Sequence, residues 1–446
     1  MMLRLRMIVA LAAAAVLASC GPEKDKKSRA VSGTDREEAY CNIDDLPPSK
    51  RHSFVVIDAV AMKPSSSPEE FREQNGFIRE LLLSVVGPDR GLPSGMIAPR
   101  ERVSLIVLPA DGSAGRLIFT GCVPGLTIDE QAKVLAGTSG WEKWTSGDPL
   151  AEVTNAGGKF TESLLAAIFA SAGELDGAGK STGGPFASSA LVQSLAASQQ
   201  LLEPAEGSAR RIFLVSDLSR FRYDGPEAGQ EGAEASKMSP EAGKKGPEAN
   251  ESPKFRGIAS AKQVGQVLRF SEVYLVQPPG SALKEKEYLG GFILGQGAKL
   301  AYFGSSVPTV ATRPPVQSLE FAGRVEYDAG PESVQMVVAR DDRNNLVYSF
   351  FALLGSNASV TPMSGTMICE TDEDCKIISD KSGFAQQWKS SSDAAKEFKP
   401  EMPLAGARDF EFTIKGETLK GEVKDEEVQL SSDPAKPALS VSATQQ

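Results

Sequence analysis

The sequence predicts an α/β domain built on a doubly wound, mostly parallel sheet, followed by a smaller all-β sandwich domain. Two observations carry this prediction. Short apolar runs alternate with helical patterns across residues 51–305, which is typical of a parallel sheet covered by helices on both faces. Across residues 317–430 the chain instead has short, partly alternating runs separated by turn residues, which favours a sandwich of antiparallel sheets.

The first strand of the α/β domain is expected over residues 53–58, at the centre of its sheet. Its apolar run ends in the carboxylate of Asp58, and a helical pattern over residues 69–86 follows. Ligands of open α/β sheets meet the carboxyl ends of the strands, so Asp58 stands where a binding site would form. Residues 210–217 repeat this arrangement, because a second buried run there ends in Asp217.

The other elements of this domain follow in chain order. Strands over residues 101–108 and 116–120 are joined by a turn-rich loop, which predicts an antiparallel hairpin at one edge of the sheet. Within residues 223–253, Pro-Glu-Ala occurs three times with hardly any apolar residue, which predicts a disordered insertion. Further helices are expected over residues 160–175, 186–202 and 281–295, and further strands over residues 272–276 and 298–303.

The sandwich domain is expected to end in a polar tail at residues 431–446. Its strands are short, because turn residues interrupt the apolar runs every few positions. They are expected over residues 319–327, 334–339, 346–354, 410–414 and 419–423.

The N-terminus has the pattern of a secretory signal. Arg4 and Arg6 precede an apolar stretch at residues 7–17 that is too short for an ordinary membrane span. The four residues that end at Cys20, Leu-Ala-Ser-Cys, resemble the lipobox of bacterial lipoproteins. The resemblance implies that residues 1–20 contain a lipoprotein signal peptide, and that Cys20 becomes the first mature residue.

By the same resemblance, Cys20 carries acyl chains such as palmitate, which anchor a protein by burying methylene groups in a membrane. Gly21 follows the cysteine. In this family that residue implies sorting to the outer membrane of a Gram-negative cell envelope. Residues 21–50 are polar and charged, which is typical of a flexible tether between the lipid and the first domain.

Four cysteines follow the lipobox, and an even number in an oxidising compartment favours two disulfides. Cys369 and Cys375 are expected to pair, because the residues on either side of an acidic tip are typical of hairpin strands. Cys41 then pairs with Cys122 by elimination. The spacing of these cysteines lacks the paired pattern of zinc ligands.

The order of elements across residues 53–304 resembles a von Willebrand factor A domain. That family holds a divalent cation with an Asp-x-Ser-x-Ser motif, a threonine and a second aspartate, all of which offer the oxygen ligands that hard cations prefer. Asp58 and Asp217 match the two acids, but Val60 and Met62 stand at the serine positions. The resemblance implies an A-type scaffold that has lost its metal, and no cofactor is expected.

Charge and histidine content exclude several functions. The formal charge is −10 and the pI is near 5.1, so the chain lacks the basic character that nucleic-acid binding requires. The only histidine, His52, stands before the first strand and is expected to be an exposed linker residue. No Ser-His-Asp or Cys-His constellation can be assembled from such a residue, so we expect a protein that is not an enzyme.

These observations favour a membrane-anchored, non-catalytic envelope lipoprotein that binds an envelope or extracellular protein through its A-like domain. Two alternatives stay open. The first is metal-dependent adhesion or ligand binding, with Mg²⁺ or Ca²⁺ held by Asp58 and Asp217. The second is an envelope hydrolase with an unfamiliar site, which would need a deep polar pocket around the same two acids.

Overall fold

All the residues described below belong to one compact unit, Gly33–Gln446. The predicted signal peptide, Cys20, most of the tether, Asp217 and nearly all of the predicted insertion lie outside the described residues. The computed structural model describes Cys41 and residues 49–63, 67–86, 97–137, 148, 150–175, 190–216, 253–278, 286–305, 313–327, 330–355, 358–379, 410–423, 426–431 and 441–442.

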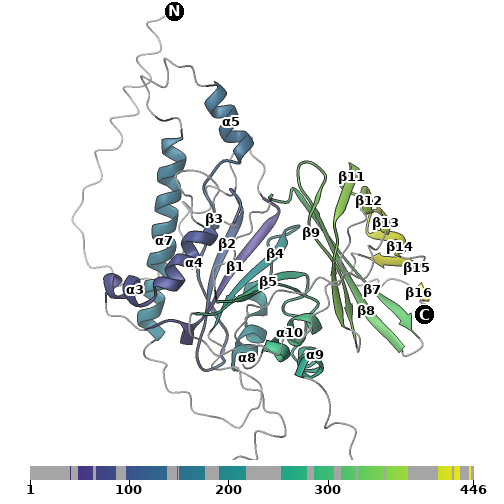
Figure 1. Cartoon of the computed structure of the whole chain (residues 1–446), viewed down its shortest axis with the longest axis horizontal. Coiled ribbons are helices and arrows are strands. Elements are labelled where there is room, and N and C mark those ends of the chain that lie inside the picture. The colour runs from purple at the N-terminus through teal and green to yellow at the C-terminus, as the bar shows by residue number, and fades with distance from the viewer. Residues whose placement is uncertain are drawn as a thin grey trace, which may run out of the picture. The chain divides into compact units, whose positions relative to one another are not determined.

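A six-stranded sheet forms the N-terminal half of the fold, in the order β3-β2-β1-β4-β5-β6 (Figure 1). Five strands run parallel and β3 at the edge pairs antiparallel with β2. The mostly parallel sheet and its edge hairpin are therefore confirmed. The strands are β1 (Arg51–Asp58), β2 (Arg102–Leu108), β3 (Arg116–Cys122), β4 (Ala209–Val215), β5 (Ser271–Val276) and β6 (Lys299–Gly304).

Helices cover both faces of this sheet, as expected for a doubly wound fold. Successive residues of β1 point to opposite faces, so Val55 and Ile57 lie in one hydrophobic core while Phe54 and Val56 lie in the other. The first core is covered by α3 (Pro68–Gln74), α4 (Gly76–Val86) and α7 (Ala151–Leu175). The second is covered by α8 (Ala190–Ala197), η4 (Gln199–Leu202), α9 (Pro253–Gln263) and α10 (Lys286–Gly295).

The single helix expected over residues 69–86 is divided at Asn75. The buried side chain of Asn75 accepts a hydrogen bond from the backbone N–H of Lys63 at 2.7 Å and donates one to the Lys63 carbonyl at 2.9 Å. The two bonds hold the chain that leaves β1 against the junction of α3 and α4. The helix is interrupted where the buried amide of Asn75 satisfies the backbone N–H and carbonyl groups of the neighbouring loop.

The C-terminal strands are all β, as predicted, and they belong to one continuous, mostly antiparallel sheet. Their order along the sheet is β10-β9-β8-β7-β15-β14-β13-β12-β11, with β16 pairing parallel with β7. They are β7 (Gln317–Tyr327), β8 (Gly330–Arg340), β9 (Leu346–Leu354), β10 (Ser359–Pro362), β11 (Gly365–Thr371), β12 (Asp374–Ser379), β13 (Phe410–Lys415), β14 (Thr418–Val423), β15 (Glu426–Ser431) and β16 (Val441–Ser442).

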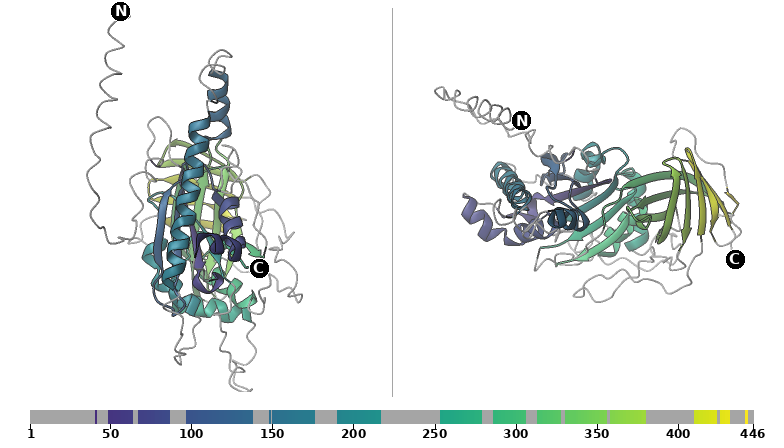
Figure 2. Two further views of the ribbon diagram at one scale, coloured as in Figure 1. Left: turned by 90° about the vertical axis from the view of Figure 1, so that its left-hand side faces the viewer. Right: turned by 90° about the horizontal axis from the view of Figure 1, so that it is seen from above.

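This sheet curls until its two ends meet (Figure 2). At one end of the sheet, β10 pairs with β9. Directly after β10, the backbone N–H of Met363 donates to the Ser349 carbonyl and extends this pairing by one residue. Thr366 still bridges to Asn345, but most of β11 pairs with β12. One bent segment thus joins both ends of the sheet, and a single apolar core fills its interior. Within the predicted polar tail, Val441–Ser442 adds a short strand beside β7.

The two sheets share a hydrophobic core. Tyr348, Phe350 and Ala352 of β9 lie in the same cluster as α9, α10 and the inner residues of β4 and β5. Two strands of the C-terminal sheet, β8 and β9, therefore have both of their faces buried. This contact explains why β9 is apolar over nearly its whole length and why β8 is apolar from Met336 to Ala339, as buried strands require.

Both disulfides expected from the cysteine pattern are present, Cys41–Cys122 and Cys369–Cys375. Cys369 and Cys375 stand directly opposite each other in the β11–β12 hairpin. Cys122 ends β3, and its pairing partner in the ladder is Arg102, the first residue of β2. Because β3 runs antiparallel, Cys41 is attached to the edge of the six-stranded sheet where the parallel strands begin.

Candidate functional site

A row of polar residues crosses the carboxyl ends of four parallel strands. The ladder pairs Ile57 with Val215, Val215 with Val276, and Val276 with Gly304. The next residue of each strand therefore stands in one row and points to one face, the face covered by α8, α9 and α10. In spatial order that row contains Asp58, Ser216, Gln277 and Ser305.

Asp58 lies where the sequence placed it, at the carboxyl end of a central strand, and it is fully buried. Its Oδ2 accepts a hydrogen bond from the Ser216 hydroxyl at 2.8 Å. Its Oδ1 accepts a longer bond, 3.4 Å, from the backbone N–H of Val60 at the start of η2 (Ala59–Ala61). The carboxylate therefore joins β1 to β4 and caps the short helix that follows it.

Gln277 is the residue of the row that sequence reasoning missed. Its side chain is 1% exposed, and neither its amide oxygen nor its amide nitrogen has a hydrogen-bond partner among the described residues. A buried polar group without a partner destabilises a fold by about 1–3 kcal/mol, so an amide with both of its polar atoms unpartnered calls for an explanation. Next to it in the row, Ser305 is exposed, so the row leads from solvent to a buried donor and acceptor.

The two positions of the A-domain motif that follow Asp58 offer no side-chain ligand for a metal ion. Val60 and Met62 carry no side-chain oxygen, and Met62 is buried in the core under α3 and α4. In the part of the chain that the structure describes, no three His, Cys, Asp or Glu residues lie close enough to hold an ion. Asp217, the second acid of the predicted pair, is outside that part.

His52 is buried, so its assignment as an exposed linker residue is wrong. It is the second residue of β1, where its Nδ1 accepts from the Ala205 backbone N–H at 3.0 Å and its Nε2 lies 2.9 Å from the Ser104 hydroxyl. Burial, together with the nearby charges of Arg102 and Arg210, lowers the pKa of His52 from 6.5 to about 3. Six residues of extended strand, about 20 Å, separate it from Asp58, so the two cannot share one catalytic site.

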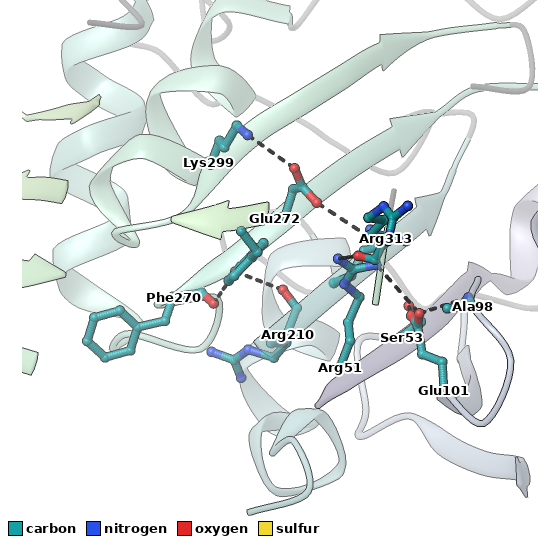
Figure 3. Close-up of polar contacts among 11 residues, drawn as sticks. Arg51, Ser53, Ala98, Glu101, Arg210, Phe270, Glu272, Lys299 and Arg313 are labelled. Atoms are coloured by element: carbon teal, nitrogen blue, oxygen red, sulfur yellow. Dashed lines mark hydrogen bonds and ion pairs between the residues drawn. The ribbon is translucent and has the colours of Figure 1, made fainter. Parts of the chain in front are cut away.

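A buried ionic cluster occupies the opposite edge of the sheet, where the strands begin (Figure 3). The ladder puts Ser53, Arg211, Glu272 and Lys299 in one row. Arg211 Nε lies 3.5 Å from Glu272 Oε2, and Lys299 Nζ lies 3.1 Å from Glu272 Oε1. Burial alone would raise the pKa of Glu272, but Lys299, Arg211 and Arg51 outweigh it and lower that pKa to about 2.

Glu101 anchors the other half of this cluster. Its carboxylate lies 3.6 Å from Arg51, accepts from the Ser53 hydroxyl, and accepts from the Ala98 backbone N–H at 3.0 Å. Tyr348 reaches the same edge from β9, with its hydroxyl 2.9 Å from the carbonyl oxygen of Arg210. The paired charges hold the strands of the six-stranded sheet together at this end, and the Tyr348 hydrogen bond attaches the C-terminal sheet to it, so the cluster has a structural role. A visible signal was the presence of charged residues at the starts of otherwise apolar strands.

None of the helices in the described ranges is long and apolar enough to span a membrane. A comparison with models of known protein families and a search for similar curated proteins both found no match.

Proposed function

We propose that this protein is a lipid-anchored envelope lipoprotein that binds a protein partner at the carboxyl edge of its six-stranded sheet, without catalysis. The observation that carries the proposal is the polar row that contains the unpartnered, buried amide of Gln277. The lipobox at Cys20 supports an envelope location. The parallel sheet with Asp58 at a strand end and an antiparallel edge hairpin supports an A-type scaffold.

The chemistry of the row favours a protein partner. A glutamine amide offers one acceptor and two donors, and a peptide backbone presents its carbonyl and N–H groups at a similar spacing. The Asp58 carboxylate is already occupied by Ser216 and Val60, which leaves the row better suited to hydrogen bonding than to binding a cation. Protein binding through loops and strand ends on a rigid scaffold is a common use of α/β sheets.

The arrangement also supports a non-catalytic role. The Ser216 hydroxyl donates a hydrogen bond to the carboxylate of Asp58. A serine nucleophile requires a base that accepts the hydroxyl proton and that is itself oriented by a third group. The only imidazole lies at the far end of β1. The row therefore holds its hydroxyl in a structural hydrogen bond.

The test is site-specific photo-crosslinking in intact envelopes. A photoreactive side chain at exposed Ser305 is expected to capture one defined protein, and the same group at exposed Glu206, beside the opposite edge of the sheet, is expected to capture none of it. Adding a chelator should leave the crosslink unchanged. A crosslink that disappears with the chelator would favour the metal-dependent alternative, and equal capture at both positions would contradict the proposal.

A further inference from the structure

The first turn of α5 (Ile128–Gly137) is fastened firmly to the body of the protein. Thr127 and Glu130 form a reciprocal cap: the Thr127 backbone N–H donates to the Glu130 carboxylate at 2.7 Å, and the Glu130 backbone N–H donates to the Thr127 hydroxyl at 3.3 Å. Arg100, which is buried, adds two hydrogen bonds to the same carboxylate at 2.8 and 2.9 Å. The direction in which α5 leaves the body is therefore set at its N-terminus.

The rest of α5 presents its side chains to solvent. Every residue from Ala132 to Gly137 is exposed, and α5 stands clear of the sheets in Figures 1 and 2. Ile128 is 69% exposed and Leu135 is 40% exposed. Ile128, Ala132 and Leu135 are spaced i, i+4, i+7 and form one apolar stripe, while Asp129 and Lys133 lie to one side.

Such a helix needs a surface to pack on. Isolated helices of this length are marginal in water, because most helix stability in proteins comes from packing of an apolar face. A short helix with an apolar stripe and a polar side is suited to lie in the plane of a membrane interface. The stripe alone does not identify the surface on which α5 packs. The position of the predicted lipid tether favours a membrane.

The tether reaches the body of the protein close to α5. Cys41 is bonded to Cys122, only six positions before Ile128. The twenty or so residues between Cys20 and Cys41 span at most about 70 Å when fully extended. A flexible chain of that length has an end-to-end distance of about 25 Å. If Cys20 is acylated, the disulfide therefore holds the start of α5 near the bilayer at high effective concentration.

We propose that the apolar stripe of α5, formed by Ile128, Ala132 and Leu135, lies on the lipid bilayer beside the anchor. This inference rests on the lipid anchor of the proposed function. It orients the molecule. The amino-terminal ends of the parallel strands, beside Cys122, face the membrane, and their carboxyl ends, beside Ser305, face a partner. Because the anchor supplies the proximity, even weak insertion of the stripe is sufficient.

The test uses full-length, lipidated protein on vesicles of phosphatidylethanolamine and phosphatidylglycerol. An environment-sensitive fluorophore at Leu135→Cys is expected to increase its emission about twofold and to be quenched by nitroxide-labelled lipid, as a probe that enters the interface does. The matched control is the same fluorophore at Ile368→Cys. Ile368 is 53% exposed, on β11, and this label should show neither change.

The outcomes separate the anchor from the helix. Protein that sediments with vesicles but shows no quenching at Leu135 overturns the membrane contact of α5 and leaves the anchor standing. Protein that does not sediment overturns the anchor and this inference with it. Amide exchange gives a second readout: residues of α5 should exchange several-fold more slowly on vesicles, and Ile128→Asp should remove that protection. Protection in whole envelopes but not on vesicles would indicate a protein neighbour and overturn the lipid assignment.

Discussion

The hydroxyl of Ser216 donates a hydrogen bond to Oδ2 of Asp58 at 2.8 Å, and both residues are fully buried at the carboxyl ends of adjacent strands. The bond links the last residue of β1 to the residue that directly follows β4. Asp58 is therefore part of the structure that holds this edge together, whether or not the edge binds a partner.

Replacing Asp58 with Ala should destabilise the protein. The change removes a charged acceptor, breaks the hydrogen bond from the buried Ser216 hydroxyl and removes the cap of η2, so the free energy of unfolding should fall by about 2–3 kcal/mol. Urea unfolding measures it. Asp342→Ala, at a side chain that is 60% exposed, should change stability by less than about 0.5 kcal/mol. Stoichiometric Mg²⁺ or Ca²⁺ that is lost from Asp58→Ala would contradict the metal-free assignment.

Two buried glutamines offer a matched comparison. Gln296 donates from its amide to the carbonyls of Ala261 and Gly265 and accepts from Leu268, whereas the amide of Gln277 has no partner among the described residues. Gln277→Met should raise the free energy of unfolding by about 1–2 kcal/mol, and Gln296→Met should lower it by at least as much.

The same pair of variants tests function. Gln277→Met should weaken the crosslink formed from Ser305 although the protein is more stable, because stabilising a binding site commonly reduces its function. A Gln277→Met protein that is less stable than the wild type would indicate that the amide is satisfied within the fold.

His52 should make the free energy of unfolding depend on pH between about pH 6.5 and about pH 3. Its pKa is lowered to about 3 in the folded protein from 6.5, so the unfolded chain binds the proton more readily, and stability is lost as the pH falls below 6.5. Between pH 7 and pH 5 the loss should be about 2 kcal/mol. His52→Gln keeps a donor for Ser104 and an acceptor for Ala205, and it should abolish this slope in urea unfolding curves.

Glu272 should act at lower pH with the same sign. Its pKa falls from 4.5 to about 2 on folding, so its stabilising contribution is complete above 4.5 and is lost as the pH falls from there toward 2. The full contribution is about 3 kcal/mol. In a His52→Gln background, acid unfolding should therefore begin only below about pH 4.5. Glu411, at an exposed ion pair with Lys376, provides the control, since Glu411→Gln should not move this transition.

The two disulfides should differ in their contribution to stability. Cys41–Cys122 closes a loop across a sequence separation of 81, and Cys369–Cys375 one of 6. The chain-entropy relation gives about 4.5 kcal/mol for the longer loop and about 2 kcal/mol for the shorter one. Double Cys→Ser variants of each pair, compared by thermal unfolding, should rank in that order. The Cys41–Cys122 variant should also lose the protection of α5 on vesicles, because it releases the tether.

Local sequence pattern determined most of the elements of this protein. The apolar run of β1 ending at Asp58 predicted a central buried strand, because a strand with both faces covered must be apolar throughout. The strict alternation of β13 predicted a strand with one face in a core, and its burial alternates accordingly. The disulfide Cys369–Cys375 was also predictable, since a hairpin brings residues that flank its tip opposite each other.

Tertiary structure alone decided the rest. The C-terminal sheet closes because Thr366 meets Asn345 as well as β12, and a partner at such sequence distance leaves no trace in local pattern. His52 is buried because Ser104 and Ala205 satisfy both ring nitrogens. Gln277 joined the site only through the register of three strand pairs. Periodicity determines which face a residue takes, whereas register and long-range hydrogen bonding determine which residues become neighbours.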